Sequence, residues 1–139
     1  MSKPQKIIKE MFDKDAFSKW LGIELMEVKD GYCKLKMKVR KEMTNGFFIA
    51  HGGICYSLAD SALAFAANSD GTQALSIETS IIYKKKVDNG DTLIATAKEI
   101  NKEQKTAVYQ INIENQQRIE VASFEGKVFR TNKEWFPTN

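Results

Sequence analysis

Apolar residues in the first 22 positions recur at the intervals of amphipathic helices. Asp13 or Asp15 is placed to cap a second short helix, and Gly22 suits its C-terminal end. The pattern therefore predicts an N-terminal helical segment over residues 1–22. The apolar positions are Ile7, Ile8, Met11 and Phe12, followed by Phe17, Trp20 and Leu21.

A period of two begins at Cys33, where apolar residues alternate with lysines as far as Arg40. This is the pattern of a strand with one buried and one solvated face. The chain then loses its charge, because Asp60 is the only charged residue between Met43 and Ser69. Within this stretch, residues 53–69 carry apolar side chains on every side of a helical wheel, which predicts a buried helix.

The second half of the chain is predicted to be almost entirely strand. Turn residues at 88–91 and 115–118 separate the runs, and their spacing favours an antiparallel meander. Residues after Thr131 are expected to be loosely held, which makes 132–139 a C-terminal tail. The strand-like runs span residues 75–83, 93–100, 106–114 and 119–130.

Together these elements predict one small α+β domain over residues 1–139. A strongly twisted antiparallel sheet would wrap around the single buried helix. One sheet with one helix leaves sheet edge and sheet face uncovered. We therefore expect the chain to form a homodimer, by edge pairing or by packing of the helices of two subunits.

The composition excludes several classes of protein. The 139 residues carry 21 basic and 18 acidic side chains, and a net charge of +3 is too mild for a nucleic-acid partner. The longest apolar run, residues 62–67, is too short to span a membrane. Two cysteines and one histidine are too few for a zinc site, so no metal is expected. Cys33 and Cys55 are predicted to be inert core residues, and the missing signal and cysteine framework favour a cytoplasmic location.

Asp60 is the residue that most strongly suggests chemistry. It lies in the middle of the predicted buried helix, where a lone carboxylate is costly unless it is paired or hydrogen-bonded. No lysine or arginine lies three or four residues away to pair with it. A structural role, facing solvent or satisfying a backbone group, is one interpretation. The other is a general base or nucleophile, because carboxylates in such settings have raised pKa values.

The segment His51-Gly52-Gly53 directly precedes the same helix. Glycines let a ligand approach the backbone, and the first amides of a helix are free donors at its positive end. Such amides can stabilise an oxygen that becomes anionic during a reaction, although an ordinary flexible helix entry has the same pattern. Asp60 lies about 10 Å further along the axis, too far to serve the same atom. Two antiparallel helices from different subunits would bring the two groups together.

Three other features have both a structural and a functional interpretation. His51, the only histidine, either stabilises its loop or acts as a base. Asn45 either makes an ordinary turn or orients substrate or water. The run Lys84, Lys85 and Lys86 is either a solvated strand end or a rim that binds phosphate.

Residues 50–60, AHGGICYSLAD, resemble the signature of the PaaI-like (phenylacetate-degradation type) hotdog-fold acyl-CoA thioesterases. The family has an asparagine six residues before the histidine and an acid nine residues after it, and Asn45, His51 and Asp60 keep both spacings. The resemblance covers nearly the whole chain. It implies a hotdog fold and a homodimer or dimer of dimers with active sites at the subunit interface.

The resemblance also implies roles for the candidate residues. Asp60 would be the nucleophile or the base that activates water. The Gly52 amide, with help from Gly53, would polarise the thioester carbonyl from the other subunit. Asn45 and His51 would shape that loop and position water.

The implied reaction is hydrolysis of an aryl- or medium-chain acyl-CoA to the free acid and coenzyme A. No cofactor is expected, since coenzyme A is part of the substrate. Lys84, Lys85 and Lys86 stand where many relatives have an Arg-Pro pair, and they are the candidates to bind the coenzyme A phosphates. Phe48 and Tyr56 either line an acyl pocket or belong to the core.

Two other functions are compatible with this pattern. A hotdog dehydratase or hydratase pairs a histidine with an acid against a 3-hydroxyacyl thioester, but the His-Gly-Gly segment before an aspartate helix favours the thioesterase. A non-catalytic acyl-CoA-binding protein is the other alternative. Sensors of that kind carry an added DNA-binding domain, for which 139 residues leave no room.

Overall fold

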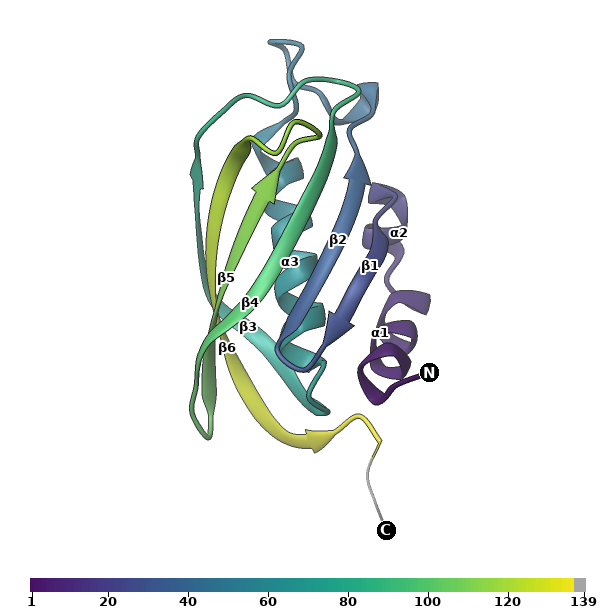
Figure 1. Ribbon diagram of the computed structural model, residues 1–139, viewed down its shortest axis with the longest axis vertical. Helices are drawn as coiled ribbons and strands as arrows, with labels where there is room; N and C mark the ends of the chain where they lie inside the picture. Colours follow the sequence, from purple (N-terminus) through teal and green to yellow (C-terminus); the bar gives the residue numbers. More distant parts are fainter. Residues whose placement is uncertain (137–139) are drawn as a thin grey trace.

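A computed structural model describes residues 1–136, in which one six-stranded sheet curves around one long helix (Figure 1). Two shorter N-terminal helices lie beside the first strands. The α+β architecture and the wrapped helix are therefore confirmed. The elements are α1 (Lys3–Asp13), α2 (Ala16–Leu21), β1 (Glu24–Lys29), β2 (Tyr32–Lys38), a 3-10 turn (Lys41–Met43), α3 (Gly52–Asn68), β3 (Thr72–Tyr83), β4 (Thr92–Lys102), β5 (Thr106–Glu114) and β6 (Glu120–Glu134).

The N-terminal segment is helical, as predicted, and its ends follow local rules. Ser2 and Gln5 form a capping box at the start of α1. Asp15 caps α2, because its carboxylate accepts the Ser18 N–H at 2.9 Å. Gly22 ends α2 in the left-handed conformation, with φ +76°.

The sheet has the strand order β1-β2-β4-β5-β6-β3, and every pairing is antiparallel. Strands β4, β5 and β6 form the predicted meander, but β3 pairs with β6 at the edge and not with β4. The turn residues 88–91 therefore do not close a hairpin. They are held against the end of β2, where Val39 donates to the Asp91 carbonyl and accepts from the Gly90 N–H.

Helix α3 packs into the concave face of the sheet. Most of its apolar side chains between Ile54 and Ala67 are buried, and small residues such as Ala62 and Ala66 let the backbone lie close to the strands. Gly126 on β6 serves the same purpose. A Cβ atom at this position would lie 2.5 Å from the Leu63 Cδ2 atom, so only glycine allows this approach of strand and helix.

The burial of α3 is incomplete on one side. Gly53 and Asp60 are exposed in the single chain, and Ser57 and Ala64 are half-buried. The helix is thus buried on its sheet side, and a narrow stripe along it remains open. This corrects the prediction of a helix that is covered all round.

The edge strand β3 and the C-terminal segment also differ from expectation. Alternation along residues 75–83 predicts a half-buried strand, but Leu75 is 68% exposed and Ile77 is 57% exposed. The C-terminal segment is held more firmly than expected. Strand β6 continues to Glu134, and Trp135 donates its N–H to the Gly71 carbonyl at 2.8 Å. The last residues of the expected tail, 137–139, lie outside the described part.

The described chain contains no helix that is long and apolar enough to cross a membrane. Among the described residues there is also no group of three or more histidine, cysteine, aspartate or glutamate side chains placed to hold a metal ion. Both cysteines are free and buried. Burial raises the pKa of the Cys33 thiol to about 12 and that of the Cys55 thiol to about 11, so neither forms a reactive thiolate near neutral pH.

The close contact between Gly126 and Leu63 makes a prediction about stability. The change Gly126→Ala should destabilise the protein by about 1–3 kcal/mol, because the added methyl group overpacks a buried contact. Urea unfolding measures this loss. The matched control is Gly46→Ala, since a methyl group there meets no atom within 4 Å. Equal urea midpoints for the two variants would contradict the prediction, because they would show that α3 and β6 accommodate the methyl group with no loss of stability.

Candidate active site

The start of α3 carries one open hydrogen-bond donor. His51 is the N-cap residue, and its Nδ1 atom accepts the Gly53 N–H at 3.0 Å. A neutral imidazole with Nδ1 as acceptor carries its proton on Nε2. The Gly52 N–H finds no acceptor among the described residues. Of the two predicted amides, Gly52 is therefore the free one, and it points from the positive end of a 17-residue helix.

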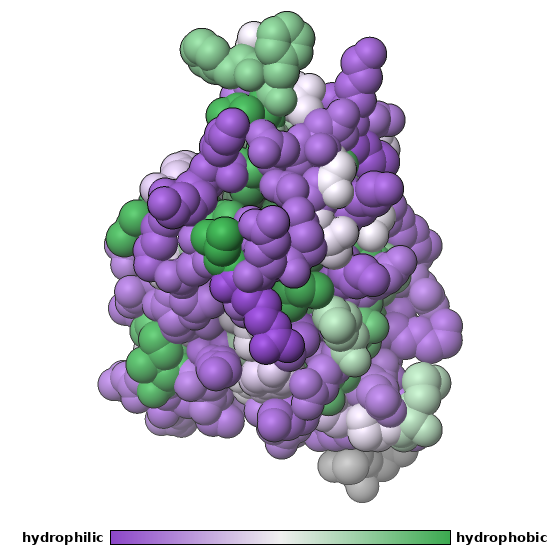
Figure 2. Space-filling model, turned by 45° about the horizontal axis from the view of Figure 1, so that its top comes forward, coloured by the Kyte–Doolittle hydropathy of each residue, from purple (hydrophilic) through white to green (hydrophobic). Residues whose placement is uncertain are grey.

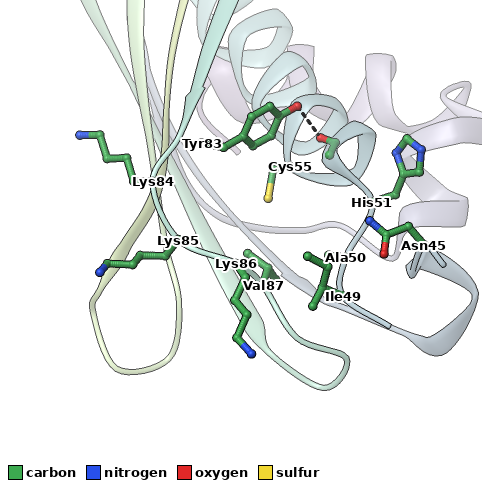
Figure 3. A pocket seen from close by; sticks show the side chains of 11 residues that line it. Asn45, Ile49, Ala50, His51, Cys55, Tyr83, Lys84, Lys85, Lys86 and Val87 are labelled. Carbon is green, nitrogen blue, oxygen red and sulfur yellow. Dashed lines mark hydrogen bonds between the residues drawn. The ribbon is translucent and has the colours of Figure 1, made fainter. Parts of the chain in front are cut away.

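Tyr83, at the end of β3, fixes this helix start from the side. Its hydroxyl donates to the Gly52 carbonyl at 2.9 Å (Figure 3). A methyl group on Gly52 would lie 3.0 Å from the same hydroxyl. Burial raises the pKa of the Tyr83 phenol, so it stays a neutral donor at physiological pH. Our sequence interpretation missed Tyr83, although its place directly before the three lysines is a usable signal.

A cavity of about 350 Å³ opens beside Gly52, and we call it the lysine cavity. It brings together most of the residues predicted to carry chemistry, while Gly53 lies just outside it. Asn45 belongs to its wall, but its side chain closes the local turn by accepting the Phe47 N–H at 2.9 Å. The lining residues are Asn45, Ile49, Ala50, His51, Gly52, Cys55, Tyr83, Lys84, Lys85, Lys86 and Val87.

The three lysines of this cavity differ in their partners. Lys84 forms an ion pair with Glu120 at 2.7 Å, and Lys86 lies 3.8 Å from Asp88. Lys85 has no carboxylate within ion-pair distance among the described residues. In Figure 3 the Lys84 and Lys85 side chains extend away from His51. Lys85 is thus the cation most available to an incoming anion.

Phe48 and Tyr56, both predicted to bind substrate, lie outside the lysine cavity. Phe48 is 85% exposed in the loop between β2 and α3, with φ +63°. An apolar knob projects at the top of Figure 2, the end where this loop lies in Figure 1. Tyr56 is half-buried, packs edge-to-face on Phe124 and shares a hydrogen bond with Thr79. The geometry of Tyr56 is that of a core residue with a satisfied hydroxyl.

Asp60 lines a different cavity of about 490 Å³, which we call the Asp60 cavity. Its walls come from α3, from β3 and β6, and from Met11 of α1. The Asp60 side chain is exposed in the single chain, yet the surrounding atoms remove part of its hydration and raise its pKa. The negative charge of Asp15 raises the pKa further. Ser76 of β3 lines the same cavity, and the sequence interpretation missed it.

The two halves of the predicted site are therefore separate within one chain. The Gly52 amide and Asp60 belong to cavities that share no residue. Along the helix they are about 12 Å apart, by the rise per residue. One cavity has a hydrogen-bond donor and cations but no free carboxylate. The other has a carboxylate with a raised pKa, and its lining lysine, Lys133, forms no ion pair with Asp60 within the described part of the chain.

Comparison with known proteins identifies the class of this chain. The sequence profile of the thioesterase superfamily matches residues 48–122, and the chain belongs to this family. Its fold is the hotdog fold. The chain is 41% identical over 120 residues to the acyl-coenzyme A thioesterase PaaI of Escherichia coli, a match that covers 86% of each protein.

Solved structures agree with this assignment. The structure of E. coli PaaI superimposes with a TM-score of 0.93 at 38% identity, covering 95% of this chain and 96% of that one. A hypothetical thioesterase from Streptococcus pneumoniae, solved with coenzyme A, has a TM-score of 0.84 at 26% identity and covers 90% and 98%. A Streptococcus mutans protein bound to acetyl-CoA has a TM-score of 0.78 at 27% identity and covers 81% and 90%.

The contact between Gly52 and Tyr83 makes the effect of Gly52→Ala testable in two steps. If the thioester carbonyl binds at the Gly52 N–H, the methyl group of Gly52→Ala should hold the carbonyl away from this donor and lower kcat by about 10²–10³, the cost of one lost oxyanion hydrogen bond. The added methyl group also crowds the Tyr83 hydroxyl. The double variant with Tyr83→Phe removes the hydroxyl contact at 3.0 Å, keeps the ring carbon at 3.2 Å, and should remain slow.

Steady-state hydrolysis by the two single variants and the double variant, each with a thermal melt, separates these effects. Tyr83→Phe alone sets the baseline for the missing hydroxyl. Recovery of kcat in the double variant would assign the defect to the displaced tyrosine, and the oxyanion role of Gly52 would be lost.

Proposed function

We propose that this protein is an acyl-CoA thioesterase that hydrolyses aryl- or medium-chain acyl-CoA to the free acid and coenzyme A. The observation that carries the proposal is the unpaired Gly52 N–H at the positive end of α3, in a cavity rimmed by lysines. The donor suits a carbonyl oxygen that gains negative charge, and the lysines suit a phosphorylated carrier. The named E. coli relative and the coenzyme A complexes described above support the same substrate class.

In the proposed reaction the thioester carbonyl oxygen accepts the Gly52 N–H. Asp60 either removes a proton from the attacking water or attacks the carbonyl itself. In the first case a C–O bond forms with water and the C–S bond breaks. In the second, water hydrolyses an acyl-carboxylate intermediate after the thiol has left. Both routes consume one water and release a carboxylic acid and the coenzyme A thiol.

The carboxylate in each site would come from a second subunit. Two antiparallel α3 helices would place Asp60 of one subunit beside the Gly52 amide of the other and so overcome the separation of about 12 Å within one chain. The exposed apolar side chains of Leu75 and Ile77 and the free edge of β3 offer the surface for such pairing. We therefore propose a homodimer or a dimer of dimers with shared sites.

Ser76 has a supporting role in this arrangement. Its hydroxyl lines the Asp60 cavity, and a hydroxyl can donate to a carboxylate or to a bound water. We assign Ser76 to the positioning of the water that Asp60 activates. His51 holds the glycine segment by accepting the Gly53 N–H, and Asn45 fixes the turn that precedes it by accepting the Phe47 N–H.

A hydratase or dehydratase is not favoured by this geometry. The Nδ1 atom of His51 is occupied as a helix cap, so only one nitrogen of the single histidine is available for proton transfer. The absence of a cofactor and the cytoplasmic location expected from the sequence stay predictions. A non-catalytic acyl-CoA-binding protein would bind the substrate without turnover, which a direct assay of thiol release distinguishes.

Lys85 gives the most direct test of coenzyme A binding. Because Lys85 has no ion-pair partner among residues 1–136, Lys85→Ala should raise KM several-fold and leave kcat nearly unchanged, the sign of lost uniform binding. The effect should shrink as salt is added, since exposed charges are screened. Lys105→Ala, in the β4–β5 hairpin, is the matched control. An unchanged KM for Lys85→Ala would make the lysine run an ordinary solvated strand end.

Asp60→Asn tests the reacting group. It should lower kcat at least a hundredfold, within the range of about 10²–10⁴ for a lost general base. The raised pKa means that the folded protein binds this proton more tightly than the unfolded chain, so stability is lost as pH rises through the folded pKa. Asp60→Asn should therefore melt no lower than the wild type at pH 7. The difference should vanish well below pH 4.

Mixed assemblies test whether the site is shared. Dimers formed from Asp60→Asn and Gly52→Ala subunits should regain activity, because one of their two sites contains both native groups. Light scattering on the same samples gives the mass of the assembly. Retained kcat in Asp60→Asn, or a fully active monomer, would contradict the mechanism.

A further inference from the structure

A third cavity of about 320 Å³ opens beside the start of α3, between this helix and α2. We call it the α2 cavity. Its aromatic wall consists of Phe17 and Trp20, which are 55% and 48% exposed. Neither residue is part of the site described so far. Its α3 side is formed by Gly53, Ile54 and Ser57.

The aromatic wall is fixed in place before any ligand arrives. The Phe17 and Trp20 rings are nearly parallel, with centroids 6.2 Å apart and an interplanar angle of 11°. The Arg40 guanidinium lies 5.0 Å from the centre of the Trp20 ring. It is held there by hydrogen bonds to the Trp20 and Leu21 carbonyls, at 2.7 and 3.2 Å. Two exposed aromatic side chains kept rigid in this way favour binding of a flat apolar group.

The α2 cavity borders the proposed active site at His51. His51 lines both the lysine cavity and the α2 cavity. On α3, Gly52 and Cys55 face the lysine cavity, whereas Gly53 and Ser57 face the α2 cavity. At about 100° per residue these pairs lie on opposite sides of the helix. The free Gly52 N–H thus lies at the helix end between a basic cavity and an aromatic one.

We infer that the α2 cavity is the acyl subsite, and that Trp20 and Phe17 determine the preference for flat apolar acyl groups. The inference rests on the proposed function. A thioester carbon bears sulfur on one side and the acyl group on the other, so the two parts diverge from a carbonyl held at Gly52. The phosphorylated part suits the lysines. The acyl part then extends toward the aromatic wall, which has no lysine in its lining.

A comparison of two substrates tests the assignment. Trp20→Ala should lower kcat/KM for benzoyl-CoA about tenfold or more, the scale of a lost apolar contact in a specificity pocket, and change it less than about twofold for acetyl-CoA. Phe17→Ala should act in the same direction. Trp20→Phe retains an aromatic wall and should recover most of the loss. Ile100→Ala, an exposed apolar residue on β4, is the matched control and should change neither substrate.

Tryptophan fluorescence gives a readout that does not depend on turnover. Trp20 and Trp135 are the two tryptophans, so Trp135→Phe leaves Trp20 as the reporter. In an Asp60→Asn background, benzoyl-CoA should shift or quench the Trp20 emission, and coenzyme A alone should not. Wild-type protein that releases no thiol would overturn the proposed function, while the emission change would still test the subsite.

Three outcomes would overturn the subsite. Equal losses for benzoyl-CoA and acetyl-CoA in Trp20→Ala would remove its role in selectivity. Quenching by coenzyme A alone would place the adenine ring on the aromatic wall. A change in assembly mass in Trp20→Ala would make the wall a contact between subunits.

Discussion

The packing of α3 into the curved sheet is the constraint on which the rest of the molecule depends. Leu58, Ala62 and Ala66 have no exposed surface, and Gly126 on β6 removes the one side chain that would hold the strand away. A helix fixed along its whole sheet side cannot shift or rotate. The position of its first amide and of its single carboxylate is therefore set by the core, and no mobile loop is needed to place them.

The same packing determines what remains uncovered. The sheet has only one helix to cover it, so the apolar residues of β3 and the stripe from Gly53 to Ala64 stay open. An edge strand with exposed Leu75 and Ile77 is a surface that proteins normally cover. The uncovered edge and the incomplete site lie on the same side of α3, since Ser76 and Leu75 line the Asp60 cavity. The proposed assembly and the proposed reaction would therefore use the same surface.

The sequence correctly predicted which residues of a strand are buried in the core. It did not predict which distant segments are in contact. Strand β5 has its predicted apolar face buried, from Ala107 to Ile113, because alternation directly reflects the sheet core. Strand β1 was missed because its side chains are mostly exposed and do not alternate. The pairing of β3 with β6 was missed because the turn at 88–91 signals a bend but not its partner. Local signals cannot specify which strands meet.

The residues of the candidate site also fall into those that the sequence predicted and those that only the structure revealed. The HGG segment and Asp60 were found because glycines and a lone acid are visible in an uncharged stretch. Tyr83 and Ser76 were not, because each comes near the site through the pairing of β3 at the sheet edge. The sequence also could not show that Gly53 is unavailable as a second donor to the substrate. Only the structure shows that its N–H already donates to His51 Nδ1.

The spacing along α3 sets a limit on how this site can vary. Gly52 and Asp60 are separated by a little more than two helical turns. At about 100° per residue, this spacing fixes the angle around the helix axis between the donor and the acid. One inserted residue between them would rotate Asp60 by that angle, away from the open stripe, to the position of Ser61, which is buried and lies 2.8 Å from Ser18 of α2. There a carboxylate would lose its hydration with no cation to replace it. The core contacts of α3 and the geometry of the reaction therefore restrict the same nine residues, 52–60.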